Sequence, residues 1–303
     1  MNNNLTKMHS NDIEIIKNVF HCREQDILDI QLLKKGMTNH SYLFTCNGGE
    51  KYIIRVPGEG TNKLISRTHE AKSYKAIEPY QICEKPLYIN AQNGYKITRF
   101  IENVRVCDPF DFEQVRQCMQ KLKKFHALNL QTDYEFDLFK TILYYESLRG
   151  ENPSYYKDYE QVKEHVFSLR EFIQKHIQRV CFCHIDAVPD NFLFDDARTD
   201  ELHLQLTDWE YAAMQDPDLD IAMFCIYSMY KKEQIDKTID LYYENQCPAD
   251  IRIKIYCYIA SCGLLWSNWC EYKFQFGTDF GEYALQQYRY AKEYYRLVEN
   301  LIK

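Results

Sequence analysis

Two short polar segments contain the residue types that phosphoryl transfer requires. Residues 183–193 read C-H-I-D-A-V-P-D-N-F-L, which places Asp186 and Asn191 on one tight loop before an apolar run. The second segment follows another apolar run and begins at Asp208, 17 residues after Asn191. An alcohol acceptor needs a base beside its hydroxyl, and Mg²⁺ on the phosphates needs oxygen ligands. We therefore predict that Asp186 is the catalytic base and that Asn191 and Asp208 bind Mg²⁺.

Either segment alone would also be typical of a polar turn capped by Asp and Asn. The spacing between them, however, suits a β-hairpin that returns Asp208 beside the first loop. Two such segments in this order, each at the junction of a strand and a loop, favour a kinase. We expect His184 to hold this loop through hydrogen bonds, and Asp220 to anchor it by capping or by a bond to its backbone.

Strand patterns dominate the first hundred residues. The Asn-Gly-Gly turn at 47–49 separates two alternating runs and predicts a β-hairpin. Helices are expected at residues 12–20 and 63–77. Strands are expected at residues 30–33, 41–45, 51–56, 86–90 and 95–100.

Helical periodicity dominates from residue 110 onward, with one β-rich island at residues 192–208. The predicted helices cover residues 112–128, 155–177, 219–230, 234–245, 250–272 and 283–302. This order predicts an α+β fold of two lobes, a β-rich N-terminal lobe and a larger, mostly helical C-terminal lobe. We place the lobes at residues 1–102 and 103–303, with the cleft between them as the active site.

The catalytic loop, the D-W-E motif at 208–210 and the β-rich N-terminal lobe resemble a known superfamily. It comprises the choline/ethanolamine kinases and the aminoglycoside phosphotransferases, which have a protein-kinase-like fold, and the chain is most similar to the bacterial choline kinases. The resemblance runs from about residue 33 to residue 290. Its further motifs are G-M-T-N at 36–39, Y-I-I-R-V-P-G at 52–58, D-P-x-x-D at 216–220 and L-W-S-N-W at 265–269.

The resemblance implies ATP and Mg²⁺ as cofactors. Arg55 would grip the ATP phosphates, since its planar fork can contact two oxygens at once, and Glu70 would be its ion-pair partner. One loop would cover the phosphates, and a hinge segment would meet the adenine through its backbone. These are Gly36, Met37, Thr38 and Asn39 for the loop, and Phe100, Ile101 and Glu102 for the hinge.

Two tryptophans indicate the acceptor. Trp266 and Trp269 are three residues apart on a predicted helix, so both lie on one face. Such rings can enclose a quaternary ammonium, which has no N–H donors, although core packing is the commoner fate of helical tryptophans. The resemblance assigns a choline site that combines these rings with further residues, namely Asp186, Glu210, Tyr211 and Tyr283.

The sequence departs from related patterns at three places. The phosphate loop has one glycine instead of G-x-G-x-x-G, so this loop alone is a weak indication. Ile185 replaces the arginine of protein kinases, and no A-P-E motif follows, which disfavours control by loop phosphorylation and a protein substrate. Phe280 stands where relatives often have tyrosine, so a ring is kept and a hydroxyl is lost.

Composition excludes several classes of protein. The net charge of −7 disfavours a nucleic-acid partner, and the absence of a long apolar run disfavours a membrane span. The 12 cysteines contain no C-x-x-C pair, and the N-terminus lacks the pattern of a signal peptide. We expect reduced thiols in a cytoplasmic protein, with Cys181 and Cys183 on a core strand rather than at a metal.

These features predict an ATP-dependent choline kinase that produces phosphocholine. Two alternatives stay open. One is an ethanolamine or aminoglycoside kinase of the same fold, and the other is a catalytically silent module that binds choline or nucleotide. No oligomeric state follows from the sequence.

Overall fold

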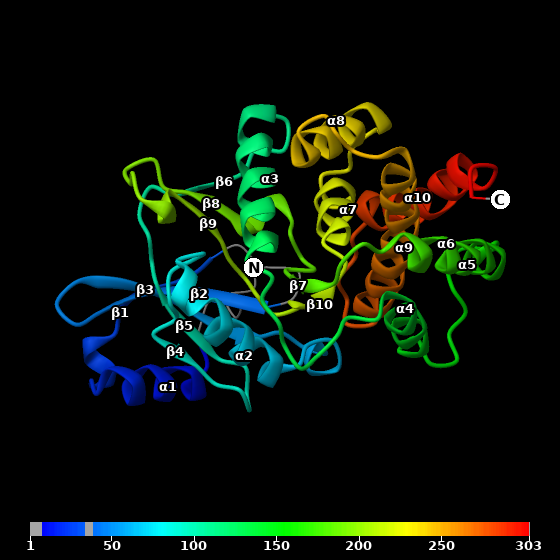
Figure 1. The fold of residues 1–303 in the computed structure, drawn as a ribbon. Coiled ribbons are helices and arrows are strands. Elements are labelled where there is room, and N and C mark those ends of the chain that lie inside the picture. Colours follow the sequence, from blue (N-terminus) through cyan, green and yellow to red (C-terminus); the bar gives the residue numbers. More distant parts are fainter. Residues whose placement is uncertain (1–7, 34–38, 303) are drawn as a thin grey trace. The chain divides into compact units, whose positions relative to one another are not determined.

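The structure is a computed structural model of the 303-residue chain, and it describes residues 8–33 and 39–302. The chain divides into two compact units, whose elements are labelled in Figure 1. Unit 1 comprises Met1–Val104 and Asp195–Leu202. Unit 2 comprises Arg105–Phe194 and His203–Lys303.

Unit 1 contains a five-stranded antiparallel sheet in the order β1-β2-β3-β5-β4. The β2–β3 hairpin closes where Cys46 pairs with Glu50, and Asn47, Gly48 and Gly49 all have positive φ in the turn. The predicted hairpin is therefore confirmed. The strands are β1 (Leu28–Leu32), β2 (Asn39–Cys46), β3 (Glu50–Pro57), β4 (Tyr88–Ile89) and β5 (Lys96–Arg99).

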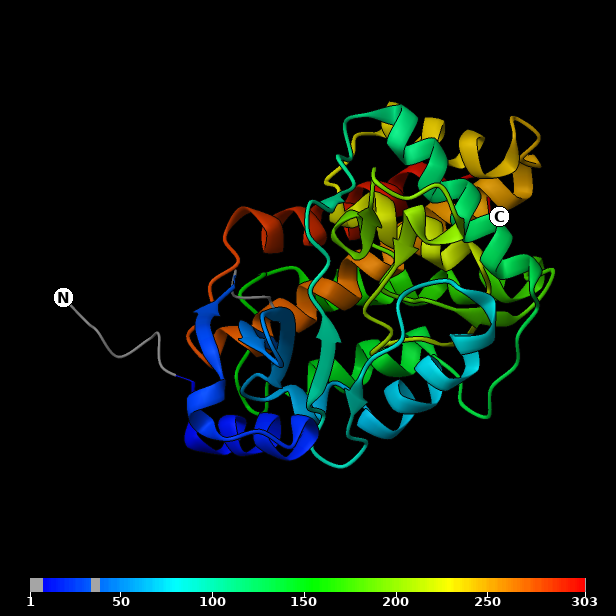
Figure 2. The ribbon, with the colours of Figure 1, turned by 90° about the vertical axis from the view of Figure 1, so that its left-hand side faces the viewer.

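Two α-helices complete the described part of unit 1. Helix α1 (Ser10–Phe20) lies against the sheet (Figure 2). Its apolar side packs there, with Ile16 fully buried and the Phe20 ring 4.5 Å from that of Tyr52. Helix α2 (Arg67–Ile77) begins after Ser66, whose hydroxyl accepts a bond from the backbone of His69. It starts later than predicted because the preceding residues form a separate 3₁₀ turn. The 3₁₀ turns of this unit are Glu24–Asp26, Thr61–Lys63, Glu78–Tyr80 and Glu201–His203, the last of which ends in unit 2.

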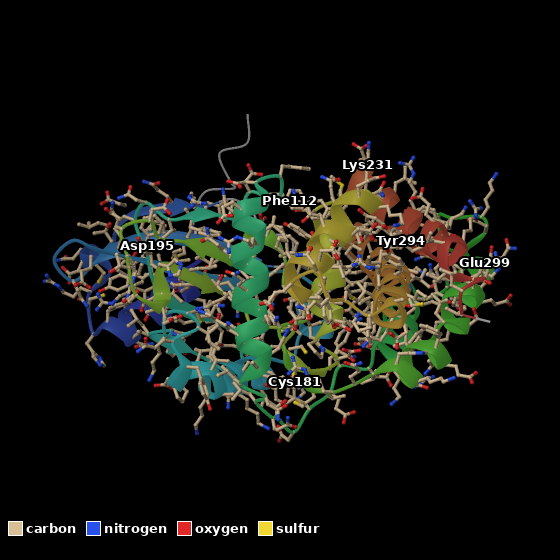
Figure 3. All side chains as sticks on the ribbon, turned by 45° about the horizontal axis from the view of Figure 1, so that its top comes forward. Phe112, Cys181, Asp195, Lys231, Tyr294 and Glu299 are labelled. Carbon is tan, nitrogen blue, oxygen red and sulfur yellow. The ribbon has the colours of Figure 1, made fainter. Side chains whose placement is uncertain are left out.

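Unit 2 is built around helix α9, whose residues 254–273 are all buried. A helix that is enclosed on every side belongs to the core, and α9 packs against α4, α7 and α10 (Figure 3). The helices of the unit are α3 (Phe112–Ala127), α4 (Leu138–Ser147), α5 (Tyr159–Ser168), α6 (Arg170–His176), α7 (Asp218–Tyr227), α8 (Lys232–Tyr243), α9 (Ala249–Phe274) and α10 (Glu282–Val298).

Two small antiparallel sheets lie in unit 2. One has the order β6-β8-β9, and the other pairs β10 with β7. The pairing of β8 with β9 confirms the hairpin predicted between the two polar segments. The strands are β6 (Arg105–Val106), β7 (Cys181–Cys183), β8 (Phe192–Phe194), β9 (Leu204–Leu206) and β10 (Ala213–Gln215), and a 3₁₀ turn at Pro189–Asn191 precedes β8.

The structure corrects part of the element prediction. The single helix predicted at residues 155–177 is wrong, because α5 begins only at Tyr159 and the regular helix is interrupted at Leu169. Helix α4 and strands β6 and β10 were not predicted. The strands are too short to show periodicity, whereas α4 had an N-cap signal in Asp137, which accepts from Lys140 N.

All 12 cysteines are unpaired, and the strand position predicted for Cys181 and Cys183 is confirmed by the buried strand β7. Within the described ranges, no helix combines the length and apolar character that crossing a bilayer would need.

Gly263 allows α9 and α10 to pack closely. A Cβ at this position would lie 2.6 Å from the carbonyl oxygen of Gln287 and 2.9 Å from the Cβ of Tyr290. We predict that Gly263→Ala lowers the free energy of unfolding by about 1–3 kcal/mol, because two packed helices must separate. Urea denaturation measures this change. Helix propensity alone predicts a gain of about 1 kcal/mol, so a stabilised variant would contradict the close packing.

Candidate active site

A buried carboxylate anchors the loop between β7 and β8. The side chain of Asp220 accepts bonds from the backbone N–H groups of His184 at 2.9 Å and Ile185 at 2.7 Å. Ile185 has a φ of +67°, a conformation that is unfavourable for a β-branched residue. These two bonds offset that cost and hold the loop in place, which confirms the anchoring role expected for Asp220.

The side chain of His184 also holds this loop in place. Its Nε2 lies 2.8 Å from the carbonyl oxygen of Thr207, and its ring packs edge-on against Trp209 at 4.6 Å. Burial lowers the pKa of His184, which favours the neutral ring. The expectation that His184 anchors the loop through hydrogen bonds is confirmed.

The loop orients Asn191 toward Asp186. The Asn191 amide nitrogen donates to the Asp186 carbonyl at 2.8 Å and to the Asp186 carboxylate at 3.2 Å, which leaves the amide oxygen as its other polar atom. The N–H of Thr207 donates to the Asn191 carbonyl at 2.8 Å, so the β8–β9 hairpin brings the next residue, Asp208, beside the loop. Asp208 itself has a φ of +64°.

Negative charge is concentrated around Asp186. The pKa of Asp186 is raised to about 8, mainly by burial and in addition by the charges of Asp208 and Glu210. The hydrogen bond from Asn191 opposes this shift. A set of carboxylate and amide oxygens in mutual repulsion fits a hard divalent cation, which would relieve the repulsion. The residues present therefore suit Mg²⁺.

Five rings form what we call the aromatic cluster. The ring centroids of Trp266 and Trp269 are 5.3 Å apart, so the predicted common face is confirmed. Tyr211 lies 5.8 Å from Trp266, Phe280 lies 5.0 Å from Trp269, and Tyr283 lies 6.4 Å from Phe280. Trp266 is 6% exposed and Trp269 is fully buried, so both rings also belong to the core of unit 2.

The aromatic cluster shares the electrostatic environment of Asp186. Burial raises the pKa of Tyr211 well above its usual range, and the charges of Glu210 and Asp186 add to this effect. Burial likewise raises the pKa of Tyr283, with a smaller contribution from Asp186. Tyr211 and Tyr283, which the resemblance assigns to the acceptor site, are therefore close enough to Asp186 for its charge to affect them.

Two further tyrosines at this site were missed by sequence reasoning. The Tyr227 ring lies 6.0 Å from Tyr283, and its hydroxyl donates to Asp190 at 2.8 Å. Burial raises the pKa of Tyr145, and the charges of Asp186 and Glu210 contribute. Tyr227 was detectable because it follows Asp220 by seven residues on one helix face. Tyr145 lies on α4, a helix that was not predicted.

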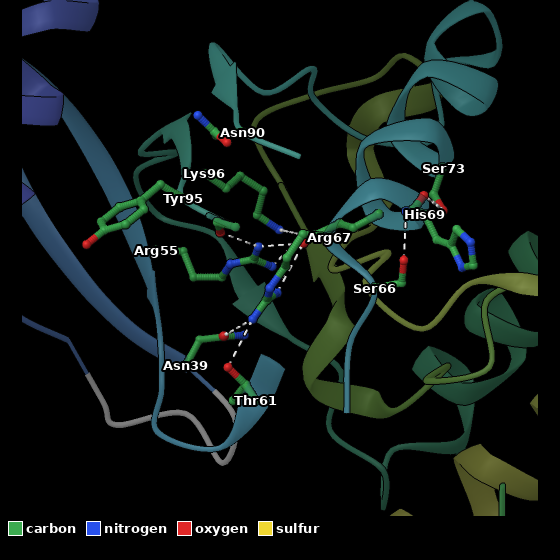
Figure 4. A network of polar contacts seen from close by, with 12 residues as sticks. Asn39, Arg55, Thr61, Ser66, Arg67, His69, Ser73, Asn90, Tyr95 and Lys96 are labelled. Carbon is green, nitrogen blue, oxygen red and sulfur yellow. Dashed lines mark hydrogen bonds and ion pairs between the residues drawn. The ribbon is translucent and has the colours of Figure 1, made fainter. Parts of the chain in front are cut away.

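Unit 1 contains the second set of predicted residues, of which Asn39 and Arg55 are labelled in Figure 4. Arg55 binds Glu70 through two contacts, Nη1 to Oε1 at 2.5 Å and Nη2 to Oε2 at 2.7 Å, and both side chains are buried. The expected ion pair is present. Arg67 at 3.2 Å and Lys96 at 3.5 Å also approach Glu70, so three cations surround one carboxylate. Sequence reasoning missed both, although Arg67 precedes Glu70 by one helical turn.

The network around Arg67 depends on a close backbone approach. Gly94 has a φ of +75°, its carbonyl accepts from Arg55 at 3.0 Å, and a Cβ there would lie 2.5 Å from the Arg67 Nε. Asn39 joins the network, because its amide oxygen accepts from Arg67 at 3.2 Å. The other residues assigned to the phosphate loop, Gly36, Met37 and Thr38, lie outside the described residues.

The predicted hinge follows directly after β5. The N–H of Phe100 donates to the carbonyl of Lys51 at 2.9 Å and so extends the sheet by one residue. Glu102 forms an exposed ion pair with the Lys51 side chain at 2.7 Å, and Ile101 between them is half-buried. Because the Phe100 N–H is already used, backbone N–H contacts to an adenine would have to come from the residues after it.

Comparisons with known proteins agree on one family. A profile described as choline/ethanolamine kinase matches residues 30–260. Protein LicA of Haemophilus influenzae is 28% identical over 297 residues, which cover 93% of this chain and 84% of LicA. The crystal structure of choline kinase LicA from Streptococcus pneumoniae has 29% identity and a TM-score of 0.81, and the match covers 95% of this chain and all of that one.

A second solved structure, LicA in complex with AMP, has 28% identity and a TM-score of 0.80 and covers 94% of this chain and 98% of its own. These similarities confirm the predicted α+β, protein-kinase-like fold.

The repulsion around Asp186 leads to a prediction for the protein in EDTA without ligands. The folded state keeps a proton on Asp186 up to a pH of about 8, whereas an unfolded Asp loses it near 4. The folded state then binds more protons, so stability falls as the pH rises through this interval. Asp186→Asn should raise the melting temperature at pH 8 by a few degrees and flatten the pH dependence.

Asp250→Asn is the matched control, because Asp250 is an exposed carboxylate in the first turn of α9. It should give no stabilisation. Thermal melts between pH 5 and pH 9 make the comparison, and an Asp186→Asn variant less stable than the parent throughout would contradict the electrostatic account.

Proposed function

Because the chain belongs to the choline/ethanolamine kinase family, we propose that it transfers the γ-phosphoryl group of ATP to the hydroxyl of choline. The observation that carries this proposal is the aromatic cluster within the electrostatic reach of Asp186. A quaternary ammonium is attracted to ring faces, and each such contact stabilises it by about 0.5–2 kcal/mol. The hydroxyl of choline is two carbons away from that ammonium, so a base must lie close to the rings.

Asp186 is proposed to orient the choline hydroxyl and to accept its proton. The hydroxyl oxygen forms a bond to the γ-phosphorus as the bond to the bridging oxygen of ADP breaks. Asn191 keeps the Asp186 carboxylate in position through its amide nitrogen. Catalysis of this kind is mostly positioning and charge stabilisation, and the Asp220 anchor supplies the first of these.

Glu210 is proposed to balance the charge of the acceptor. It is buried, and its charge raises the pKa values of Asp186 and Tyr211. A bound cation would reverse that effect, because opposite charge favours the ionised form of a carboxyl group. Choline would therefore help to deprotonate Asp186 as it binds.

Mg²⁺ is proposed to bind through the oxygens of Asn191 and Asp208. When bound, it would neutralise charge on the phosphates. The donor set fits because these side chains offer oxygen ligands in a region of repelling negative charge.

The nucleotide is proposed to bind through unit 1. Arg55 is proposed to contact a phosphate. Its guanidinium is already held in one orientation by Glu70 and by the Gly94 carbonyl. Arg67 and Lys96 add positive charge around the same carboxylate. Asn39, together with Gly36, Met37 and Thr38, is proposed to cover the phosphates, and Phe100, Ile101 and Glu102 to contact the adenine.

Ethanolamine is the nearest alternative acceptor. Its primary ammonium would use carboxylates such as Asp186 and Glu210 more than ring faces, and both carboxylates are present. An aminoglycoside is disfavoured, since its primary ammonium groups would pair with carboxylates and leave the aromatic cluster little to bind.

The acceptor and the base are tested together by a coupled assay of ATP turnover with Mg²⁺. We predict turnover with choline that exceeds turnover with ethanolamine or an aminoglycoside. Asp186→Ala should lower kcat by about 10²- to 10⁴-fold, because the general base is lost, while Asp250→Asn should leave it unchanged.

Preference for another acceptor would keep the kinase chemistry and reject choline as substrate. Failure of all three acceptors alongside tight choline binding would favour a silent binding module.

The cation–π contribution is tested with a neutral isostere, 3,3-dimethylbutan-1-ol, which has a carbon in place of the choline nitrogen. We predict that Trp266→Leu raises the KM for choline by about tenfold, because one ring face is lost. The KM for the isostere should change much less, and the KM for ATP serves as an internal control. Equal changes for both alcohols would show that Trp266 contributes shape only.

A further inference from the structure

A second concave site lies in unit 2, between the segment before α5 and helix α10. Its volume is about 420 Å³, which is within the range of small-molecule sites. None of its lining residues belongs to the aromatic cluster or to the catalytic loop. The residues that line this basic groove are Tyr155, Tyr156, Lys157, Asp158, Leu285, Tyr288, Arg289, Lys292, Glu293 and Arg296.

The floor of the basic groove is rigid. Tyr156 and Tyr288 stack face to face with centroids 3.7 Å apart and planes 6° from parallel. The Tyr156 hydroxyl donates to the carbonyl of Ala284 at 3.2 Å, and the Tyr288 hydroxyl donates to Asp158 at 2.9 Å. Lys292 also binds Asp158, and this neutralises the pair.

The loop wall of the groove is fixed to α9. Glu271 accepts from the Ser154 hydroxyl at 2.6 Å and from the backbone N–H of Tyr155 at 2.9 Å. The Tyr155 ring meets Phe274 edge-on at 5.3 Å and is 66% exposed. This ring is therefore held in place with much of its surface open to a ligand.

Positive charge remains uncompensated in the basic groove. Among the described residues, Lys157, Arg289 and Arg296 have no carboxylate within ion-pair distance. Arg289 and Arg296 are seven residues apart on α10 and lie on one face with Lys292. Among the described lining residues, Glu293 is the one carboxylate besides Asp158, so three cations face one negative charge. This excess is notable in a chain with a net charge of −7.

We propose that the basic groove binds a small soluble phosphate ester, with the phosphate on Arg289 and Arg296 and its organic part against Tyr155. Guanidinium forks match phosphate oxygens in pairs, and an exposed ring offers a surface for the attached group. The limited volume of this concave site and its packed floor suit a small ligand more than a protein segment or a membrane surface, which need a broad face. The proposal does not depend on the phosphotransferase activity.

The test is a calorimetric titration of the full chain with pyrophosphate in EDTA, using two double variants. Arg289→Gln/Arg296→Gln removes the proposed contacts. Arg116→Gln/Arg170→Gln removes the same charge from two other helices of unit 2. We expect the first variant to weaken pyrophosphate binding by about tenfold and the second to weaken it by less than about threefold. Any binding at the nucleotide site is common to all three proteins and does not alter the comparison.

Equal losses in the two variants, or no pyrophosphate binding by the parent at millimolar concentration, would overturn the proposal. Co-sedimentation with vesicles of phosphatidylcholine and phosphatidylglycerol tests the other possible source of the phosphate, a lipid headgroup. One outcome would be that the parent and the control variant bind the vesicles, that Arg289→Gln/Arg296→Gln does not, and that none of the proteins binds pyrophosphate. The phosphate would then belong to a membrane, and the soluble-ligand proposal would be wrong. Unchanged melting temperatures for both variants establish that neither change acts through unfolding.

Discussion

The geometry of the candidate active site in unit 2 depends on the carboxylate of Asp220. Its two oxygens accept bonds from consecutive backbone amides, those of His184 and Ile185, and one of them also lies 2.9 Å from His126 Nε2. Two successive N–H groups converge on one acceptor only because Ile185 adopts a left-handed conformation. The chain can keep a strained isoleucine there because three buried contacts on one carboxylate over-determine the turn. The side chain of the next residue, Asp186, is aimed by this turn.

The anchor is itself braced by elements that are distant in sequence. His126 comes from α3, and its Nδ1 lies 2.8 Å from the hydroxyl of Tyr242 on α8. Lys254 of α9 binds Asp216 at 2.5 Å and Asp218 at 2.9 Å, which fixes the start of the helix that carries Asp220. Because the supporting groups are buried and paired, the loop is held in place even though the carboxylates of Asp186, Asp208 and Glu210 repel one another. Such repulsion costs stability and is tolerated where a ligand cation is expected to remove it.

Sequence reasoning found the parts of this arrangement that depend on local spacing. The loop from His184 to Asn191 and the hairpin to Asp208 were predictable because short spacing and strand patterns leave few geometries open. The ion pair between Arg55 and Glu70 was predicted from the family resemblance and not from the spacing of the two residues. Arg67 and Lys96 were missed because their convergence on Glu70 depends on sheet register and on the close approach at Gly94. Tyr145 was missed with its whole helix, although Leu138, Ile142 and Tyr145 are buried at helical spacing after the N-cap Asp137.

The aromatic cluster shows why core packing and ligand binding are compatible interpretations of Trp266 and Trp269. Trp269 is fully buried, and the indole N–H of Trp266 donates to the sulfur of Met223 at 3.1 Å, so both rings have positions set by the core. Helix α9 is enclosed by α4, α7 and α10, and it cannot shift without disturbing all of them. Ring faces fixed in this way lose little conformational entropy when a cation binds. The proposed cage, built on a core helix, would therefore be preorganised, and the burial that indicates a structural role is compatible with the proposed binding of a cation.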